Sequence, residues 1–177
     1  AASLSLSPVI PGSLMTFFGL DLPERIYWDE VPAQVLYASP TQVNLVAPPT
    51  LAGRAATVVT WESKNTRTSV TVPVGTAAPA LFTEDGTGRG PARTGGMVRR
   101  GETIRLYATG LGALSPFRPL TISFGGVAVR AFSVPLENGI MELSATVPDT
   151  APTGMAVPLT IQTGNLTSAS GVTVAIQ

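Results

Sequence analysis

Apolar and polar residues alternate with a period of two through most of this chain of 177 residues. The clearest examples are residues 70–74, 103–107 and 171–176, where every second side chain is apolar. Such alternation is typical of a β-strand that buries one face and exposes the other. No segment keeps an apolar stripe at helical spacing over three turns. The pattern therefore predicts an all-β chain.

Nine further segments read as short strands, and turn signals separate them. We predict strands over residues 14–18, 25–28, 34–38, 43–47, 57–61, 120–124, 127–132, 140–147 and 157–163. Between them lie Pro48-Pro49, Gly125-Gly126, Asn138-Gly139 and Gly164-Asn165, which are dipeptides that favour turns. Turn signals every 8 to 12 residues or so are typical of a sandwich or a barrel.

The two halves of the chain repeat one another when Ile26 is matched to Ile122. Residues 43–48 then correspond approximately to 143–148, and the alternating valines of residues 70–74 correspond to residues 172–176. Asp29-Glu30 falls where the second half has Gly125-Gly126, so we predict a hairpin turn whose carboxylates point into water. The repeat predicts two modules: module 1, residues 1–76, and module 2, residues 77–177.

About seven strands in each module indicate two tandem immunoglobulin-like (Ig-like) β-sandwiches, in which two sheets bury their apolar faces against each other. Neither module has the Cys-Trp-Cys pattern of antibody domains. The expected core therefore consists of aliphatic residues and Phe. We expect Val43, Leu45, Leu143 and Ala145 to point inward.

Composition excludes several classes of function. The chain has no His and no Cys, which excludes Ser-His-Asp and Cys-His catalysis, thiolate or imidazole zinc sites and disulfides. Its 11 basic and 11 acidic residues balance, which argues against a nucleic-acid partner. No run approaches the roughly 18 apolar residues that would cross a membrane. We therefore expect no enzyme activity, no metal, no cofactor and no membrane insertion.

Four phrases of the sequence are similar to a C-terminal domain family that is expanded in Acidobacteria such as Solibacter. They are PGSLMTFFGLDL after the opening AAS, VPA with YASPTQVN, APALFT with DGTGRG, and GETIRLYATGLG, which begin at residues 11, 31, 78 and 101. They follow one another in the family's order and span nearly the whole chain. The stretches 21–25 and 115–120 are shorter than in other members.

The resemblance implies tandem Ig-like modules of the IPT/TIG type at the C-terminal end of a large exported or surface protein. It implies an extracellular or cell-envelope location and a protein or polysaccharide partner there. It supplies no catalytic residue that could be carried over to this chain.

Two aromatic residues and four arginines are the candidate ligand-binding residues. Tyr27 and Trp61 alternate out of phase with the expected core positions Ile26, Trp28, Val58 and Thr60, so they can stack on a sugar or contact a protein. Packing of one module on the other is the competing interpretation. The arginines can form a patch for a carboxylate, a sulfate or an acidic polysaccharide, or they can be solvated loop residues. These four are Arg89, Arg93, Arg99 and Arg100.

Three other features are weaker candidates for a site. The glycine-rich stretch 86–90 can cradle an anion or serve as a loop. Asp29-Glu30 and Glu84-Asp85 are the adjacent carboxylates that a glycosidase would need, although the predicted hairpin turn explains the first pair. Residues 1–10 carry a short alternating pattern, which we expect to lie on module 1 as an edge strand rather than on a neighbouring chain.

The leading interpretation is a non-enzymatic extracellular or cell-surface module for adhesion, assembly or spacing at the end of a larger exported protein. The alternative is a carbohydrate-binding module accessory to an enzyme.

Overall fold

The computed structural model describes residues 8–19, 22, 25–63, 66–114 and 119–177. Most of the predicted N-terminal strand falls on residues 1–7, and the two shortened stretches fall partly on 20–21, 23–24 and 115–118. These positions lie outside the described residues. Within the described residues the secondary structure is β-strand apart from two short 3-10 turns, as the alternation predicts.

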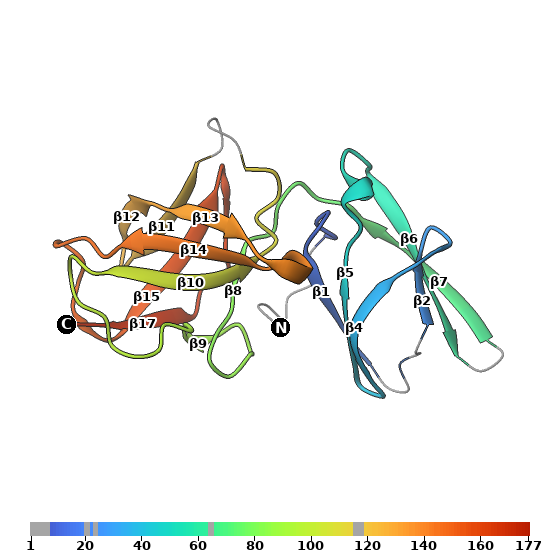
Figure 1. Ribbon diagram of the computed structural model, residues 1–177, viewed down its shortest axis with the longest axis horizontal. Helices are drawn as coiled ribbons and strands as arrows, with labels where there is room; N and C mark the ends of the chain where they lie inside the picture. Colours follow the sequence, from blue (N-terminus) through green and yellow to red (C-terminus); the bar gives the residue numbers. More distant parts are fainter. Residues whose placement is uncertain (1–7, 20–21, 23–24, 64–65, 115–118) are drawn as a thin grey trace.

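Module 1 is built from two antiparallel sheets that face each other (Figure 1). One sheet has the order β1 (Leu14–Phe18), β5 (Gln42–Val46) and β4 (Gln34–Ser39). The other has the order β3 (Val31–Pro32), β2 (Arg25–Trp28), β6 (Ala56–Ser63) and β7 (Thr66–Pro73). The 3-10 turn η1 (Pro49–Leu51) connects β5 to β6.

Module 2 repeats this plan with added strands. One sheet contains β13 (Phe132–Pro135), β14 (Met141–Thr146), β10 (Thr103–Thr109) and β8 (Ala80–Leu81). The second contains β12 (Val127–Arg130), β11 (Leu120–Phe124), β15 (Gly154–Thr163), β17 (Val172–Ile176) and β9 (Gly90–Pro91), with β16 (Leu166–Thr167) beside β15. The 3-10 turn η2 (Glu137–Gly139) joins β13 to β14.

Both modules have the strand order of an Ig-like sandwich. In module 2 the order β8-β10-β14-β13 matches strands A-B-E-D, and β12-β11-β15-β17 matches C′-C-F-G. Module 1 has the same arrangement, with β1-β5-β4 as B-E-D and β3-β2-β6-β7 as C′-C-F-G. The chain is therefore all-β, with two tandem Ig-like sandwiches.

Each module has its own hydrophobic core. One buried cluster draws its residues from positions 9–59 and the other from positions 81–176, and they share no residue. Val43, Leu45 and Leu143 are fully buried and Ala145 is nearly so, which confirms the predicted inward direction of all four. The division between residues 76 and 77 stays a prediction.

The internal repeat is confirmed by topology, since the matched residues occupy equivalent strands. Ile26 on β2 and Ile122 on β11 are both buried, and each of these strands is the C strand of its module. The matched segments on β5 and β14 are both E strands.

One predicted strand is two strands in the structure. Residues 127–132 were expected to form a single strand, but β12 ends at Arg130 and β13 begins at Phe132. Between them Ala131 is buried and donates its N–H to the carbonyl of Leu120 at 3.0 Å. The chain uses this buried residue to pass from one sheet of the sandwich to the other.

The two modules lie end to end, and the tip of the β13–β14 hairpin contacts β5 and the start of β1 in module 1 (Figure 1). No helix among the described residues is long and apolar enough to cross a membrane.

Candidate functional site

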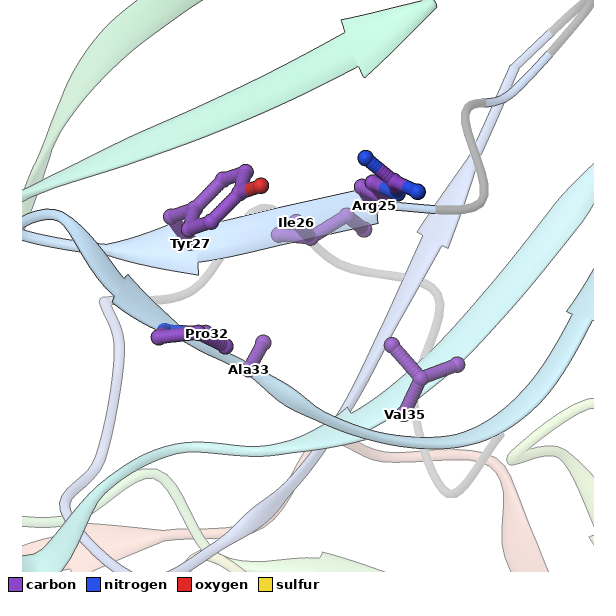
Figure 2. A pocket seen from close by; sticks show the side chains of 6 residues that line it. All are labelled: Arg25, Ile26, Tyr27, Pro32, Ala33 and Val35. Carbon is purple, nitrogen blue, oxygen red and sulfur yellow. The ribbon is translucent and has the colours of Figure 1, made fainter.

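A pocket with a volume of about 310 Å³ opens at the edge of module 1, where the chain crosses from β3 to β4. Figure 2 shows the β2 residues on one side of it and the residues of the crossing chain on the other. The lining combines a guanidinium and a phenol with small apolar side chains, and it consists of Arg25, Ile26, Tyr27, Pro32, Ala33 and Val35. Tyr27, one of the predicted ligand-binding residues, is thus at a pocket.

Neighbouring charged side chains contact both the hydroxyl and the ring of Tyr27. Its hydroxyl donates a hydrogen bond to Glu62 Oε2 at 3.1 Å, and the guanidinium of Arg67 lies 5.5 Å from the ring centroid. Arg67 also contacts Glu30 and lies 3.6 Å from Glu62 Oε1. The contact with Glu30 raises the pKa of Arg67. Arg67 thus occupies part of the ring surface that a stacking sugar would need.

The pocket has an apolar floor and a positively charged rim. Ala33 and Val35 pack against the core of module 1, so the floor of the pocket is the exposed edge of the sandwich interior. Arg25 is exposed at the rim and supplies a positive charge. Such a lining can bury a small apolar group, and a carboxylate next to that group can meet Arg25.

Trp61 lies on the opposite face from the one expected. It pairs with Ile26 across β2 and β6, while Val59, two residues earlier, pairs with Trp28. Paired residues point to the same side of a sheet, and Trp61 packs against the buried cluster of module 1. Val59 and Trp61 therefore face the core, and Trp61 is a core-edge residue.

The hairpin turn at Asp29-Glu30 is confirmed and is strained. Asp29 has φ 45° and Glu30 has φ 73°, and the equivalent Gly125 and Gly126 have φ 59° and 96°. Glycine and asparagine favour a two-residue turn with both φ values positive. The backbone at Asp29 and Glu30 is therefore strained.

The Asp29 side chain folds back onto the sheet, contrary to the prediction that it points into water. Its Oδ1 accepts the N–H of Val58 at 2.9 Å, and its Oδ2 accepts the Thr57 hydroxyl and Arg54 Nη1, each at 2.7 Å. These bonds, chiefly the one from the Val58 backbone, lower the pKa of Asp29. The contacts offset the backbone strain, so the structure gives this carboxylate an evident structural role.

Asp29→Asn should make the stability of module 1 less sensitive to acid. A carboxyl with a depressed folded-state pKa stabilises the fold above its ordinary pKa, roughly 3.9, and loses that effect as pH falls through the folded value. The free energy of unfolding of the wild type should therefore exceed that of the variant by up to about 1 kcal/mol at pH 7, and this difference should vanish in acid. Urea unfolding at a series of pH values measures it.

Thr57→Val is the matched comparison, because it removes one donor and keeps the carboxylate. The stability of Thr57→Val should still fall in acid, but by less than that of the wild type. Parallel stability curves for the wild type and Asp29→Asn at all pH values would contradict this account of Asp29.

The four predicted arginines are spread along β17. Gly90, next to Arg89, lies opposite Val172, whereas Val98, next to Arg99, lies opposite Ile176. Four residues of strand separate the two ends by roughly 13 Å. Arg100 Nε donates to the carbonyl of Ala151 at 2.7 Å, so this arginine has a structural partner. The arrangement does not gather the four into one site.

The glycine-rich stretch 86–90 is closed to an anion, because all five of its backbone N–H groups already have acceptors within the protein. The acceptors are the carbonyl and hydroxyl of Thr83, a carboxylate oxygen of Asp85, the hydroxyl of Thr87 and the carbonyl of Gly171. Hydrogen bonds from the Thr87 backbone and from the Thr83 and Thr87 hydroxyls lower the pKa of Asp85. Asp85 thus serves as the loop's internal anion. No metal-binding group of three carboxylates lies together in the described part of the chain.

Sequence reasoning missed the polar surroundings of Tyr27. Arg25, Glu62 and Arg67 come together because β2, β6 and β7 are neighbours, with Glu62 opposite both arginines. The alternation of Arg25 with Tyr27 was the signal that both occupy one face. The partner positions on β6 and β7 required the register.

No protein-family model matches the chain, and no curated protein matches it. Among solved structures, the I9-I11 tandem of titin is 13% identical to this chain, with a TM-score of 0.29. The match covers 96% of this chain and 62% of the titin tandem. The tandem Ig repeats of Dlar are 12% identical over 96% of this chain and 92% of theirs, with a TM-score of 0.31. The Plexin A4 extracellular region is 13% identical over 86% of this chain and 13% of its own, with a TM-score of 0.34. The Ig-like assignment rests on the strand order given above.

Proposed function

We propose that this chain is a non-enzymatic binding and spacing module, which holds two Ig-like sandwiches in a fixed orientation at the C-terminal end of a larger exported or cell-surface protein. Its partner is a protein that meets module 1 at the Tyr27 pocket. The sequence resemblance supports the location, and the contact between the modules supports the spacing role.

The observation that carries the proposal is the docking of the β13–β14 hairpin tip on module 1. Asn138 and Gly139 form the tip, with φ values of 59° and 73°. A Cβ atom at Gly139 would lie 2.5 Å from the carbonyl oxygen of Gly12 and 2.6 Å from the backbone nitrogen of Leu14. Module 1 therefore approaches the tip so closely that only glycine fits.

A buried hydroxyl joins the two modules at the same place. Thr109, on β10 of module 2, accepts the backbone N–H of Leu14 at 3.0 Å and donates to the carbonyl of Gly139 at 2.8 Å. Thr109 is 7% exposed, so breaking this bridge would leave a buried polar group without a partner. Packing and hydrogen bonding both fix the angle between the modules.

The carbohydrate-binding alternative gains no support from its two predicted aromatics. Trp61 packs against the core, and Arg67 lies over the ring of Tyr27. The pocket beside Tyr27 fits a protein side chain better than a stacked sugar.

Gly139→Ala should widen the distribution of distances between the modules while leaving both folded. The chain has no Cys, so Thr68→Cys and Thr167→Cys supply the only two spin-label sites, one in each module. Pulsed electron paramagnetic resonance should give a narrow distance distribution in the parent. The variant should broaden it, because the added methyl group separates the tip from Gly12 and Leu14.

Gly53→Ala is the matched control, since Gly53 has φ 82° and no atom lies within 4 Å of the place that an added Cβ atom would take. It should keep the narrow distribution. Thr109→Val, which removes the bridging hydroxyl and preserves the side-chain shape, should broaden it as Gly139→Ala does. A distribution that is already broad in the parent would overturn the spacing role.

A further inference from the structure

The outer face of the β1-β5-β4 sheet differs from the outer faces of two other sheets, which carry charged residues. Val43 and Leu45 point into the core, so the alternate residues of β5 and their partners on β1 and β4 point outward. No charged residue stands at these outward positions among the described residues. The outer face of β2, β6 and β7 carries Arg25, Glu62 and Arg67, and that of β10 and β14 carries Arg105 and Glu142.

Two exposed aromatic rings lie on this uncharged face. Phe18 is opposite Gln42 and is 55% exposed, and Tyr37 is opposite Asn44 and is 52% exposed. Tyr37 reaches the outer face because β4 has a register shift between Val35 and Tyr37. Without this bulge, Tyr37 would follow Val35 toward the core, and bulges are a known means of redirecting a side chain.

Two amide side chains lie between the rings on the central strand. Gln42 Nε2 donates a hydrogen bond to Asn44 Oδ1 at 2.8 Å, which orients both groups. The Asn44 amide nitrogen and the Gln42 amide oxygen keep capacity to donate and accept. The face thus combines aromatic surface with uncharged hydrogen-bonding groups.

The spacing of the rings suits an extended ligand. Phe18 and Tyr37 are two strands and two residues apart, which corresponds to a separation of roughly 12 Å from standard strand geometry. A flat, amphipathic ligand with apolar faces and hydroxyl edges could lie across both rings while its hydroxyls meet Gln42 and Asn44. Sugars linked in a chain have this character.

We propose that this face binds a neutral polysaccharide, with Phe18 and Tyr37 stacking on two sugar rings of one chain and Gln42 and Asn44 hydrogen-bonding to its hydroxyls. Because the described outward positions of this face carry no charge, they offer no ion pair to a charged ligand, and the proposed ligand is neutral. Figure 1 shows the β1-β5-β4 sheet on the side of module 1 turned toward module 2.

Affinity electrophoresis of the full chain tests the proposal. Native gels contain one soluble neutral polysaccharide each: hydroxyethyl cellulose, xyloglucan, mixed-linkage β-glucan, galactomannan or dextran. At least one should retard the chain. Phe18→Ser and Tyr37→Ser should each weaken that binding by about tenfold, the effect typical of an important contact aromatic.

Phe132→Ser is the matched control, because Phe132 is a 68% exposed aromatic on module 2 and lies outside this face. It should leave the retardation unchanged. No retardation by any of the five polysaccharides, or equal retardation of all variants, would overturn the proposal. Retardation by alginate or heparin alone, or a dimer in light scattering that Phe18→Ser abolishes, would also overturn it, in favour of an anionic ligand or a second copy.

Discussion

Leu143→Ala is expected to lower the free energy of unfolding of module 2 by about 2 to 5 kcal/mol, from lost apolar transfer and from the cavity left behind. Leu143 is fully buried on β14 and lies opposite Leu106, which is 1% exposed. Both are part of a cluster to which both sheets contribute, so the surrounding side chains can close the cavity only in part. Urea unfolding followed by circular dichroism measures the loss.

Thr173→Ala is the companion measurement on the solvent-facing side of β17. Thr173 lies between the buried residues Val172 and Val174, so its side chain points away from the core. Its replacement should cost less than about 0.5 kcal/mol. Equal losses at Leu143 and Thr173 would mean that the strands of module 2 have the opposite phase.

Alternation predicted most of the fold because most strands bury one face only. In β17 the valines and the isoleucine are buried and the residues between them are not, so the pattern is unambiguous. The match of Ile26 with Ile122 then extended the assignment from one module to the other. These features are local or repeated, which is why they could be read without a structure.

The phase of β6 could not be predicted in the same way. Residues 57–61 run Thr-Val-Val-Thr-Trp, and β-branched or aromatic residues occupy both faces. Thr60 is fully buried although it faces outward, and its hydroxyl is satisfied by that of Ser69 at 2.8 Å. Only the pairing of Trp61 with Ile26 decides which face meets the core.

The two sites that matter most depend on irregularities or distant contacts. The bulge in β4 reverses the direction of Tyr37, and a period of two carries no signal of an inserted residue. The Asn138-Gly139 dipeptide predicted the hairpin turn. Its docking on Gly12 and Leu14 joins residues more than 120 positions apart and has no local signature.

Gly112→Ala is expected to cost about 2 to 4 kcal/mol, through an unfavourable backbone conformation and a steric overlap together. Gly112 has φ 67°, and a Cβ atom there would overlap the carbonyl oxygen of Thr76 and lie 3.2 Å from Cβ of Ala77. Ala77 is 6% exposed, and the neighbouring Ala78 donates its N–H to the carbonyl of Gly110 at 2.8 Å. The segment that joins the modules would have to move away from module 2 and lose this burial and this hydrogen bond.

Gly95→Ala separates the two causes, because Gly95 has φ 80° but nothing within 4 Å of an added Cβ atom. Gly95→Ala should lower the free energy of unfolding by the cost of the unfavourable backbone conformation alone, about 1 to 2 kcal/mol. Thermal unfolding of both variants beside the parent measures the difference. If Gly112→Ala costs no more than Gly95→Ala, the joining segment is not packed against Gly112. The close approach at Thr76 would then not contribute to stability, and the connection between the modules would depend on the hairpin tip at Gly139.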